Sequence, residues 1–269
     1  MNNFWQRAIT GTVFVGLIVG LTMFHPYTFL GLLMLIACGG LYEYYKIVFL
    51  NQLKAIHYIY MVIGMLMVAC SRNIGLEIVS FIFALGFALS AISVLLSKER
   101  NWKHVAYLIS GLLYVALPLS LFNSQVFHGF SCVLEEYNAF LALNLFILIW
   151  SSDTFAYLCG RAFGKRKLFE SVSPKKTWEG FIGGAVLTMA FSLVLSYYWH
   201  IPYELNIAVA LCTVIFGTLG DLVESMLKRE FNIKDSGNVL PGHGGVLDRF
   251  DALLISLPFT TFCYYLFLS

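Results

Sequence analysis

Long, continuous runs of apolar residues make up most of this chain and constrain its fold more than any other feature. The runs are about 17–23 residues long, which is the length of an α-helix that crosses the hydrocarbon core of a bilayer. They lack the alternation of a half-buried strand, and an open sheet cannot satisfy its edge groups in lipid, so we expect helices. Only 12% of the residues are charged, against about 25% in a soluble domain. The sequence therefore predicts an all-α polytopic integral membrane protein.

We expect about nine transmembrane helices and a single membrane domain over residues 1–269, because the gaps between the runs are too short for a soluble domain. The expected spans are 8–24, 27–45, 56–71, 75–96, 104–122, 138–160, 181–199, 206–226 and 250–268. Residues 1–137 would supply the N-terminal helices, and residues 138–269 the helices that carry the chemistry. Small residues such as Gly183 and Gly184 would let neighbouring helices approach closely.

The basic residues indicate on which side of the membrane each loop lies. If the N-terminus is cytoplasmic and nine spans alternate in direction, every Lys and Arg except Arg72 falls in a cytoplasmic segment. This segregation is what the positive-inside rule requires. We therefore expect an N-in, C-out topology in which two polar loops, 161–180 and 227–249, dominate the cytoplasmic face.

Carboxylates interrupt or border the apolar runs near the cytoplasmic ends of the last spans. They are Asp153, Asp221, Glu224, Asp248 and Asp251. A charge in the hydrocarbon core costs at least about 2.5–3.5 kcal/mol, so such residues usually face a polar cavity and carry function. Oxygen ligands without imidazole or thiolate partners suit Mg²⁺. The acids therefore predict a metal-assisted site in the cytoplasmic half of the membrane.

Most of these acids also have a structural interpretation. Asp248 and Asp251 could cap the last helix, whose dipole favours an anion there. Asp153 could pair with Arg161. Asp221 is harder to explain in this way, because it lies near a helix C-terminus, where the dipole disfavours an anion. Asp221 therefore needs a cation nearby, either Lys228 or Arg229 or a metal ion.

The loop 161–180 is rich in basic residues. Ser173 and Pro174 resemble a helix N-cap followed by proline at the first helical position. Lys175 and Lys176 would then project from a helix N-terminus, which favours anions. The alternative is that the loop binds anionic lipid headgroups without specificity. We favour a specific phosphate-binding role for the two lysines.

The turn His243-Gly244-Gly245 offers backbone N–H groups that no side chain obstructs. Glycine also permits the φ values that let a backbone approach a phosphate closely. One histidine does not make a zinc site, so we expect His243 to donate to a phosphate or to orient an aspartate. The alternative is a turn residue that the backbone satisfies.

Residues 225–251 resemble the signature of the phosphatidate cytidylyltransferase family (CDP-diacylglycerol synthases). The matching positions are Ser225, Leu227, Lys228, Arg229, Lys234, Asp235, Gly237, Leu240, Pro241, His243, Gly244, Gly245, Val246, Asp248, Arg249, Phe250 and Asp251. A second patch is also similar and comprises Asp153, Ala156, Tyr157, Gly160, Phe163, Gly164, Lys165, Ser173, Pro174, Lys175, Lys176 and Thr177. The resemblance covers the C-terminal half, whereas residues 1–137 agree only in being a series of spans.

The resemblance implies that CTP and phosphatidic acid react to give CDP-diacylglycerol and pyrophosphate. It implies one or two divalent cations, expected to be Mg²⁺, with Asp221 and Asp248 as the metal-binding acids, and a homodimer. We expect the protein in the cytoplasmic (inner) membrane of a bacterium, with its active site on the cytoplasmic side. CTP from the cytosol and phosphatidic acid from the membrane are the expected partners, and no nucleic acid is expected.

We assign a role to each candidate residue on this basis. The candidate catalytic residues are Asp221, Asp248, Lys228, Arg229 and Asp153. The candidate substrate-binding residues are Lys175, Lys176, Lys234, Asp235, His243, Gly244, Gly245, Arg249 and Asp251. Because both substrates are anions, metal ions and basic side chains lower the main barrier, and no protein nucleophile is required.

Other functions share some of these features. A CTP-dependent lipid kinase or a polyprenol-type cytidylyltransferase would use the same membrane site with a different reaction or acceptor. An ion-coupled transporter would use Asp153 and Asp221 as coupling sites, but it favours acids near the bilayer midplane and inverted repeats. A purely structural scaffold does not explain why costly charges gather at one depth.

Overall fold

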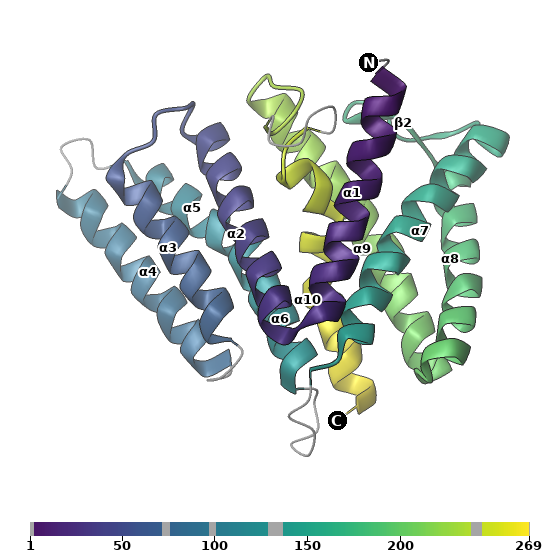
Figure 1. Ribbon diagram of the computed structural model, residues 1–269. Helices are drawn as coiled ribbons and strands as arrows, with labels where there is room; N and C mark the ends of the chain where they lie inside the picture. Colours follow the sequence, from purple (N-terminus) through teal and green to yellow (C-terminus); the bar gives the residue numbers. More distant parts are fainter. Residues whose placement is uncertain (1–2, 72–75, 97–100, 129–136, 238–243, 269) are drawn as a thin grey trace. The chain divides into compact units, whose positions relative to one another are not determined.

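The computed structural model describes residues 3–71, 76–96, 101–128, 137–237 and 244–268. The helices are α1 (Asn3–Phe24), α2 (Pro26–Val48), α3 (Ala55–Cys70), α4 (Leu76–Leu96), α5 (Trp102–Gly111), the π-helical segment η1 (Leu112–Ala116), α6 (Leu117–His128), α7 (Ala139–Phe163), α8 (Trp178–Trp199), α9 (Tyr203–Glu230) and α10 (Leu247–Leu268). Two short strands, β1 (Lys167–Phe169) and β2 (Ser173–Thr177), form an antiparallel hairpin between α7 and α8. The all-α expectation is confirmed apart from this hairpin (Figure 1).

In the described part of the chain, each expected span has a helical counterpart. The counterpart of the span 104–122 is the continuous helix formed by α5, η1 and α6. Among the described helices, α2, the α5–α6 helix and α7 to α10 are long and apolar enough to cross a membrane. α1, α3 and α4 contain shorter apolar stretches. The helical membrane class is thus confirmed, while the count of nine spans and the orientation stay predictions.

The chain divides into two compact units. The N-terminal unit comprises residues 1–128 and 235–250, and the C-terminal unit comprises residues 129–234 and 251–269. The division passes through the first turn of α10, so residues 235–250 of the signature belong with the N-terminal helices and Asp251 with the C-terminal ones. Sequence alone groups residues 235–250 with the C-terminal helices.

The N-terminal unit is built around α2, which contacts α1, α3 and the α5–α6 helix. Tyr45 of α2 is fully buried, and its hydroxyl donates to the Leu108 carbonyl at 2.9 Å. A Cβ at Gly111 would lie 2.6 Å from the Tyr45 ring, so only glycine lets the helices meet there. The π-helical segment begins at the next residue. π-helical turns are rare and occur mostly as single turns inside α-helices, as here.

The C-terminal unit depends on close packing of α7 and α8 through small residues. A Cβ at Gly183 would lie 2.7 Å from the Cys159 side chain, and a Cβ at Gly184 would lie 2.9 Å from that of Ala156. These distances are too short for a side chain. The expected role of Gly183 and Gly184 in helix contact is therefore confirmed.

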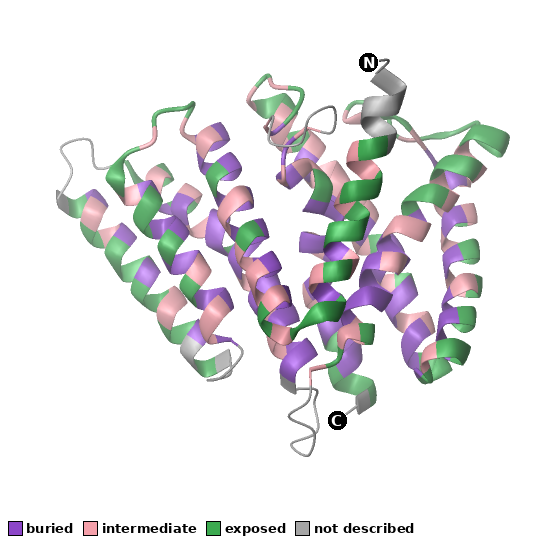
Figure 2. Ribbon diagram, in the orientation of Figure 1, coloured by how far each residue is buried: buried purple, intermediate pink, exposed green. Residues whose placement is uncertain are grey.

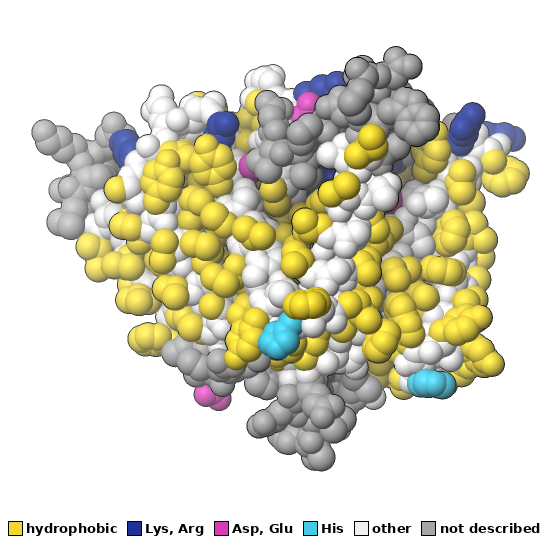
Figure 3. Space-filling view, in the orientation of Figure 1, with side chains coloured by type: hydrophobic (Ala, Val, Ile, Leu, Met, Phe, Trp, Pro, Cys, Tyr) yellow, Lys and Arg dark blue, Asp and Glu magenta, His cyan; other side chains and the backbone are white. Residues whose placement is uncertain are grey.

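The burial pattern of α8 is the reverse of that of a helix in a soluble protein. Its buried residues are mostly small or polar and recur about every four positions, namely Gly180, Gly184, Thr188, Ser192, Leu195 and Ser196. Large apolar side chains such as Ile182, Val186 and Tyr197 are exposed (Figure 2). Small residues at helix contacts and large apolar residues outside are typical of helices in lipid. Figure 3 shows apolar side chains over the visible helix surfaces of both units.

Amide side chains join three helices inside the C-terminal unit. Asn144 of α7 donates to Asn206 Oδ1 of α9 at 2.7 Å. Asn206 in turn donates to the Ser192 carbonyl of α8 at 2.9 Å and to the Ser196 hydroxyl at 3.1 Å. Both asparagines are fully buried. These bonds fix how the helices that carry the acidic residues stand within this unit.

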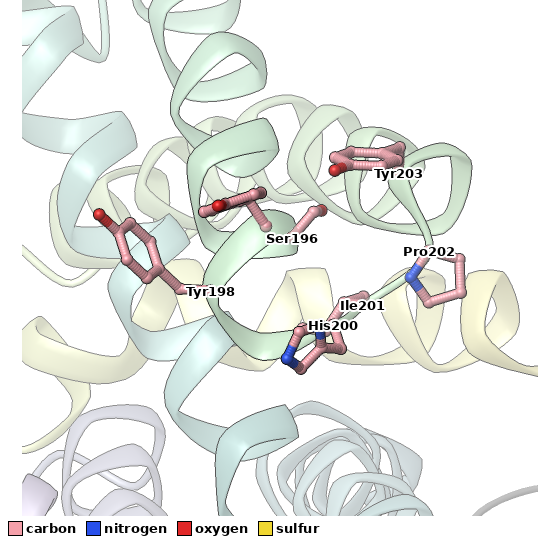
Figure 4. Close-up of a pocket in the computed structure, with 7 residues that line it drawn as sticks. Ser196, Tyr198, His200, Ile201, Pro202 and Tyr203 are labelled. Atoms are coloured by element: carbon pink, nitrogen blue, oxygen red, sulfur yellow. The ribbon is translucent and has the colours of Figure 1, made fainter.

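The α8–α9 connection borders a cavity of about 660 Å³. His200 adopts a left-handed φ of 54° and reverses the chain before Pro202. The cavity is lined by residues 196–198 and 200–203 (Figure 4). It contains no residue of the signature and lies at the end of α8 that is remote from the β hairpin.

Candidate active site

Acidic side chains from α9 and α10 meet inside the C-terminal unit. Carboxylate oxygens of Asp221, Glu224 and Asp251 all lie within 4.8 Å of one another. We call this group the acidic cluster. Asp221 and Glu224 are three residues apart and therefore share one face of α9. Glu224 and Asp251 are buried, at 1% and 9% exposure.

Gly220 makes this meeting of α9 and α10 possible. A Cβ at Gly220 would collide with the Asp251 carbonyl and would lie 3.0 Å from the Ala252 Cα. The absence of a side chain at Gly220 lets the two backbones touch next to Asp221. The acidic cluster is therefore a consequence of backbone packing as well as of sequence.

Two lysines neutralise part of the charge of the cluster. Lys176 of β2 forms an ion pair with Asp221, and Lys228 forms one with Glu224, four residues earlier on α9. Asp251 interacts electrostatically with Asp221, Asp153 and Lys176. The Ser225 hydroxyl lies 3.4 Å from Asp221 Oδ1. The ion pair that was proposed as an alternative for Asp221 is thus present, but it comes from Lys176.

The β hairpin delivers Lys176 to the cluster. Phe169 pairs with Ser173 and Lys167 with Thr177, with an irregularity between them. The expected helix start at Ser173 and Pro174 is therefore wrong, because these residues are in a strand. Thr177 caps α8 instead, and its hydroxyl accepts the Gly180 N–H at 3.2 Å.

Glu179 of α8 fixes the other side of the hairpin. Its Oε2 accepts the backbone N–H of Lys165 at 2.9 Å and that of Arg166 at 3.1 Å. These bonds hold the turn that leaves α7. The basic residues at this turn are exposed, namely Lys165, Arg166 and Lys167.

Asp248 belongs to the N-terminal unit and is held by described residues 235–237 and 244–246, which we call the signature loop. Its Oδ2 accepts hydrogen bonds from the Ser236 N–H at 2.9 Å, the Ser236 hydroxyl at 3.0 Å and the Gly245 N–H at 2.8 Å. Gly244 has a φ of 83°, and a Cβ there would lie 2.6 Å from the same oxygen. The expectation that glycine supplies an unusual φ in this turn is confirmed at Gly244.

Glu43 of α2 is a site residue that the sequence reasoning missed. Its Oε1 accepts the Val246 N–H at 3.0 Å, and its Oε2 accepts the Leu247 N–H at 2.8 Å and the Ser236 hydroxyl at 2.9 Å. Only 1% of Glu43 is exposed. The signal was a glutamate inside an expected span, which by itself indicates a functional position.

The remaining candidates lie at the surface of their units. Asp153, Lys175, Arg229, Lys234, Asp235 and Arg249 are exposed. His243 lies outside the described residues. Asp221 and Asp248 belong to different units, and each has the partners given above. A metal ion shared by these two acids stays a prediction.

The acidic cluster fits a hard divalent cation. It offers carboxylate oxygens from two helices, without histidine or cysteine. Mg²⁺ prefers such oxygen donors and completes its shell with water and substrate phosphates. Lys176 and Lys228 adjoin the cluster. Their positive charges would therefore also attract an anion held by such a cation.

Comparison with known proteins is consistent with this chemistry. A family model described as "Cytidylyltransferase family" matches residues 5–267. The chain is 38% identical over 179 residues to a phosphatidate cytidylyltransferase of Bacillus subtilis (strain 168), covering 65% of this chain and 64% of that protein.

Two further relatives carry the same name. The chain is 38% identical over 181 residues to a phosphatidate cytidylyltransferase of Staphylococcus haemolyticus, covering 66% of this chain and 65% of that protein. It is 41% identical over 155 residues to one of Haemophilus influenzae, covering 55% and 51%. The matched regions thus span less than two thirds of these relatives.

Proposed function

Because the chain belongs to the cytidylyltransferase family, we propose that it transfers CMP from CTP to phosphatidic acid. The products are CDP-diacylglycerol and pyrophosphate. The observation that carries the proposal is the acidic cluster, with Lys176 and Lys228 paired to two of its acids. The names of the relatives support the choice of phosphatidic acid as acceptor.

The reaction needs charge neutralisation more than it needs a nucleophile from the protein. A phosphate oxygen of phosphatidic acid attacks the α-phosphorus of CTP, and the bond from that phosphorus to the bridging oxygen breaks as pyrophosphate leaves. The attacking oxygen is already ionised at neutral pH, so a strong general base is unnecessary. Both reactants are anions, and basic side chains reduce their repulsion.

Mg²⁺ is the cation proposed for this site, with Asp221 and Asp248 as its ligands and Glu224 and Asp251 beside it. Asp248 precedes Asp251 by three residues in α10, which is a spacing that places side chains on one helix face. The cation would supply positive charge to the phosphates of CTP. One or two cations are compatible with the number of carboxylates.

The basic residues are proposed to bind the phosphates. Lys176 and Lys228 would exchange their carboxylate partners for phosphate oxygens when CTP binds, because a triphosphate carries more negative charge than one carboxylate. Others would hold the outer phosphates and the lipid headgroup, namely Lys175, Arg229, Lys234, His243, Arg249 and the backbone N–H groups of Gly244 and Gly245. Asp235 would orient the basic side chains. Asp153 would orient the basic side chains near Asp251.

The proposed location follows from the two substrates. CTP is soluble, whereas phosphatidic acid is confined to one leaflet, so the site must open to both water and lipid. We propose the cytoplasmic side of a bacterial inner membrane, in line with the segregation of Lys and Arg. A homodimer is proposed from the family resemblance.

A two-label assay tests the proposal. Purified protein in detergent is given phosphatidic acid, Mg²⁺ and CTP labelled on either the α- or the γ-phosphate. A cytidylyltransferase transfers only the α label to lipid and releases pyrophosphate, whereas a lipid kinase transfers the γ label. Asp221→Asn and Asp248→Asn should fold and lose nearly all turnover. Transfer of the γ label, or substantial turnover in either variant, would overturn the assignment.

A further inference from the structure

Glu43 closes the N-terminus of α10 from a different helix. The first N–H groups of a helix have no partner within it and carry the positive end of the helix dipole. Here the N–H of Leu247, the first residue of α10, and the N–H of Val246 just before it donate to the two carboxylate oxygens of Glu43, at 2.8 and 3.0 Å. A buried carboxylate thus replaces the usual local cap. α2 and the start of α10 both belong to the N-terminal unit.

The signature loop is shaped around this carboxylate. A Cβ at Gly237 would collide with Glu43 Oε1, and a Cβ at Gly245 would collide with Glu43 Oε2 and with the Ser236 hydroxyl. On α2, a Cβ at Gly39 would lie 2.8 Å from the Val246 side chain. Glycines on both sides therefore keep the space in which Glu43 meets the loop.

Ser236 connects Glu43 to Asp248. Its hydroxyl oxygen lies 2.9 Å from Glu43 Oε2 and 3.0 Å from Asp248 Oδ2. One hydroxyl hydrogen can serve only one carboxylate at a time, and the same oxygen accepts the Asp248 N–H at 3.3 Å. The Ser236 side chain thus links Asp248 Oδ2 to Glu43 directly.

We propose that Glu43 is a positioning residue that sets the orientation of the Asp248 carboxylate, through Ser236 and through the first N–H groups of α10. The inference rests on the proposed function in that Asp248 acts as a ligand of the cation. Groups that orient metal ligands commonly change metal affinity or activity by about 10- to 100-fold when removed. A carboxylate that only capped the helix would affect stability alone.

Glu43→Gln is the central test variant. The amide retains one acceptor oxygen but presents an NH₂ group to one of the backbone donors, so one bond is lost. Full-length protein in detergent is compared by hydrogen exchange of residues 244–250, by Mn²⁺ binding followed by electron paramagnetic resonance, and by steady-state kinetics. We expect faster exchange at Val246 and Leu247 and about 10-fold weaker Mn²⁺ binding. The matched control is Glu204→Gln, an exposed acid in the first turn of α9.

Ser236→Ala is the second variant, since it leaves both Glu43 bonds to α10 in place and should fold. It should weaken Mn²⁺ binding as Glu43→Gln does, and the double variant should lose less than the sum of the two single losses, because Glu43 and Ser236 share one of the two connections to Asp248. Additive losses, or a Glu43→Gln protein with lower thermal stability but unchanged Mn²⁺ affinity and exchange, would overturn the proposal.

Failure of the proposed function is a separate outcome. If Asp248→Asn leaves Mn²⁺ affinity unchanged, the metal assignment fails, and the exchange of the Ser236 and Gly245 N–H groups, which donate to Asp248 Oδ2, then decides on Glu43 alone. Unchanged exchange in Glu43→Gln overturns the positioning role, whatever the wild-type protein catalyses.

Discussion

Lys176 and Asp221 form an ion pair that joins the β hairpin to the cytoplasmic end expected for α9. The lysine side chain is 26% exposed and the aspartate side chain 38%. The pair is therefore accessible to a soluble ligand while it remains partly shielded from water. A lysine at the edge of an acidic cluster can exchange its carboxylate partner for an oxygen of a bound phosphate.

Replacing this lysine should impair CTP use. In Lys176→Ala, the loss of one charge-assisted bond to a phosphate should lower kcat/KM for CTP by about 10- to 100-fold. Steady-state kinetics with CTP varied at saturating phosphatidic acid provides the measurement. Lys167→Ala, an exposed lysine on the facing strand, serves as the control and should change kcat/KM little. Equal losses in the two variants would mean that the hairpin contributes only general positive charge.

Gly220 and Gly217 offer a matched pair on α9. A Cβ at Gly220 would collide with the α10 backbone, whereas a Cβ at Gly217 would make ordinary contact with Ala252 at 3.6 Å. Gly220→Ala should therefore destabilise the protein by about 1–3 kcal/mol, as overpacking does, and should weaken Mn²⁺ binding by separating Asp221 from Asp251. Gly217→Ala should be nearly neutral.

Thermal unfolding in detergent and Mn²⁺ titration test this pair of glycines. If Gly220→Ala binds Mn²⁺ like the wild type, then close contact of α9 and α10 is not required for the acidic cluster.

Much of this arrangement could be predicted because lipid allows few alternatives. Each apolar run became a helix, since a backbone in hydrocarbon must satisfy its own hydrogen bonds. The helix ends were less predictable. α9 continues to Glu230 and α7 to Phe163, because a helix does not need to stop where the hydrocarbon core stops. The hydropathy pattern indicates only the part of each helix that lies in the hydrocarbon core of the bilayer.

The hairpin was missed because its signals are local and ambiguous. Ser173-Pro174 fits a helix start as well as a strand, and the pairing with Phe169 across the turn decided between them. Glu43 was missed for a different reason. Its partners are about two hundred positions away in the sequence, and apart from the Ser236 hydroxyl they are backbone N–H groups, which leave no mark on side-chain patterns.

The Lys228–Glu224 pair should be important for stability. Glu224 is 1% exposed and the Lys228 side chain 15%, and removing one partner of a buried pair is costly. Lys228→Met should destabilise the protein by about 3 kcal/mol. The double variant Glu224→Gln with Lys228→Met should regain most of this loss, because no uncompensated charge remains buried. Arg229→Met, at the exposed neighbouring position, should cost less than about 0.5 kcal/mol. A double variant as unstable as the single one in SDS unfolding would contradict this account.

Gly244 should tolerate no side chain, for two independent reasons. Its φ of 83° costs an ordinary residue about 1–2 kcal/mol, and a Cβ would lie 2.6 Å from Asp248 Oδ2. Gly244→Ala should therefore lower both the thermal stability and the rate of pyrophosphate release, the latter by about 10- to 100-fold because Asp248 is displaced. Gly31→Ala on α2 is the control, since a Cβ there meets nothing within 4 Å, and it should leave both quantities unchanged or raise the stability slightly. Full activity in Gly244→Ala would show that the contact of Gly244 with Asp248 does not matter for catalysis.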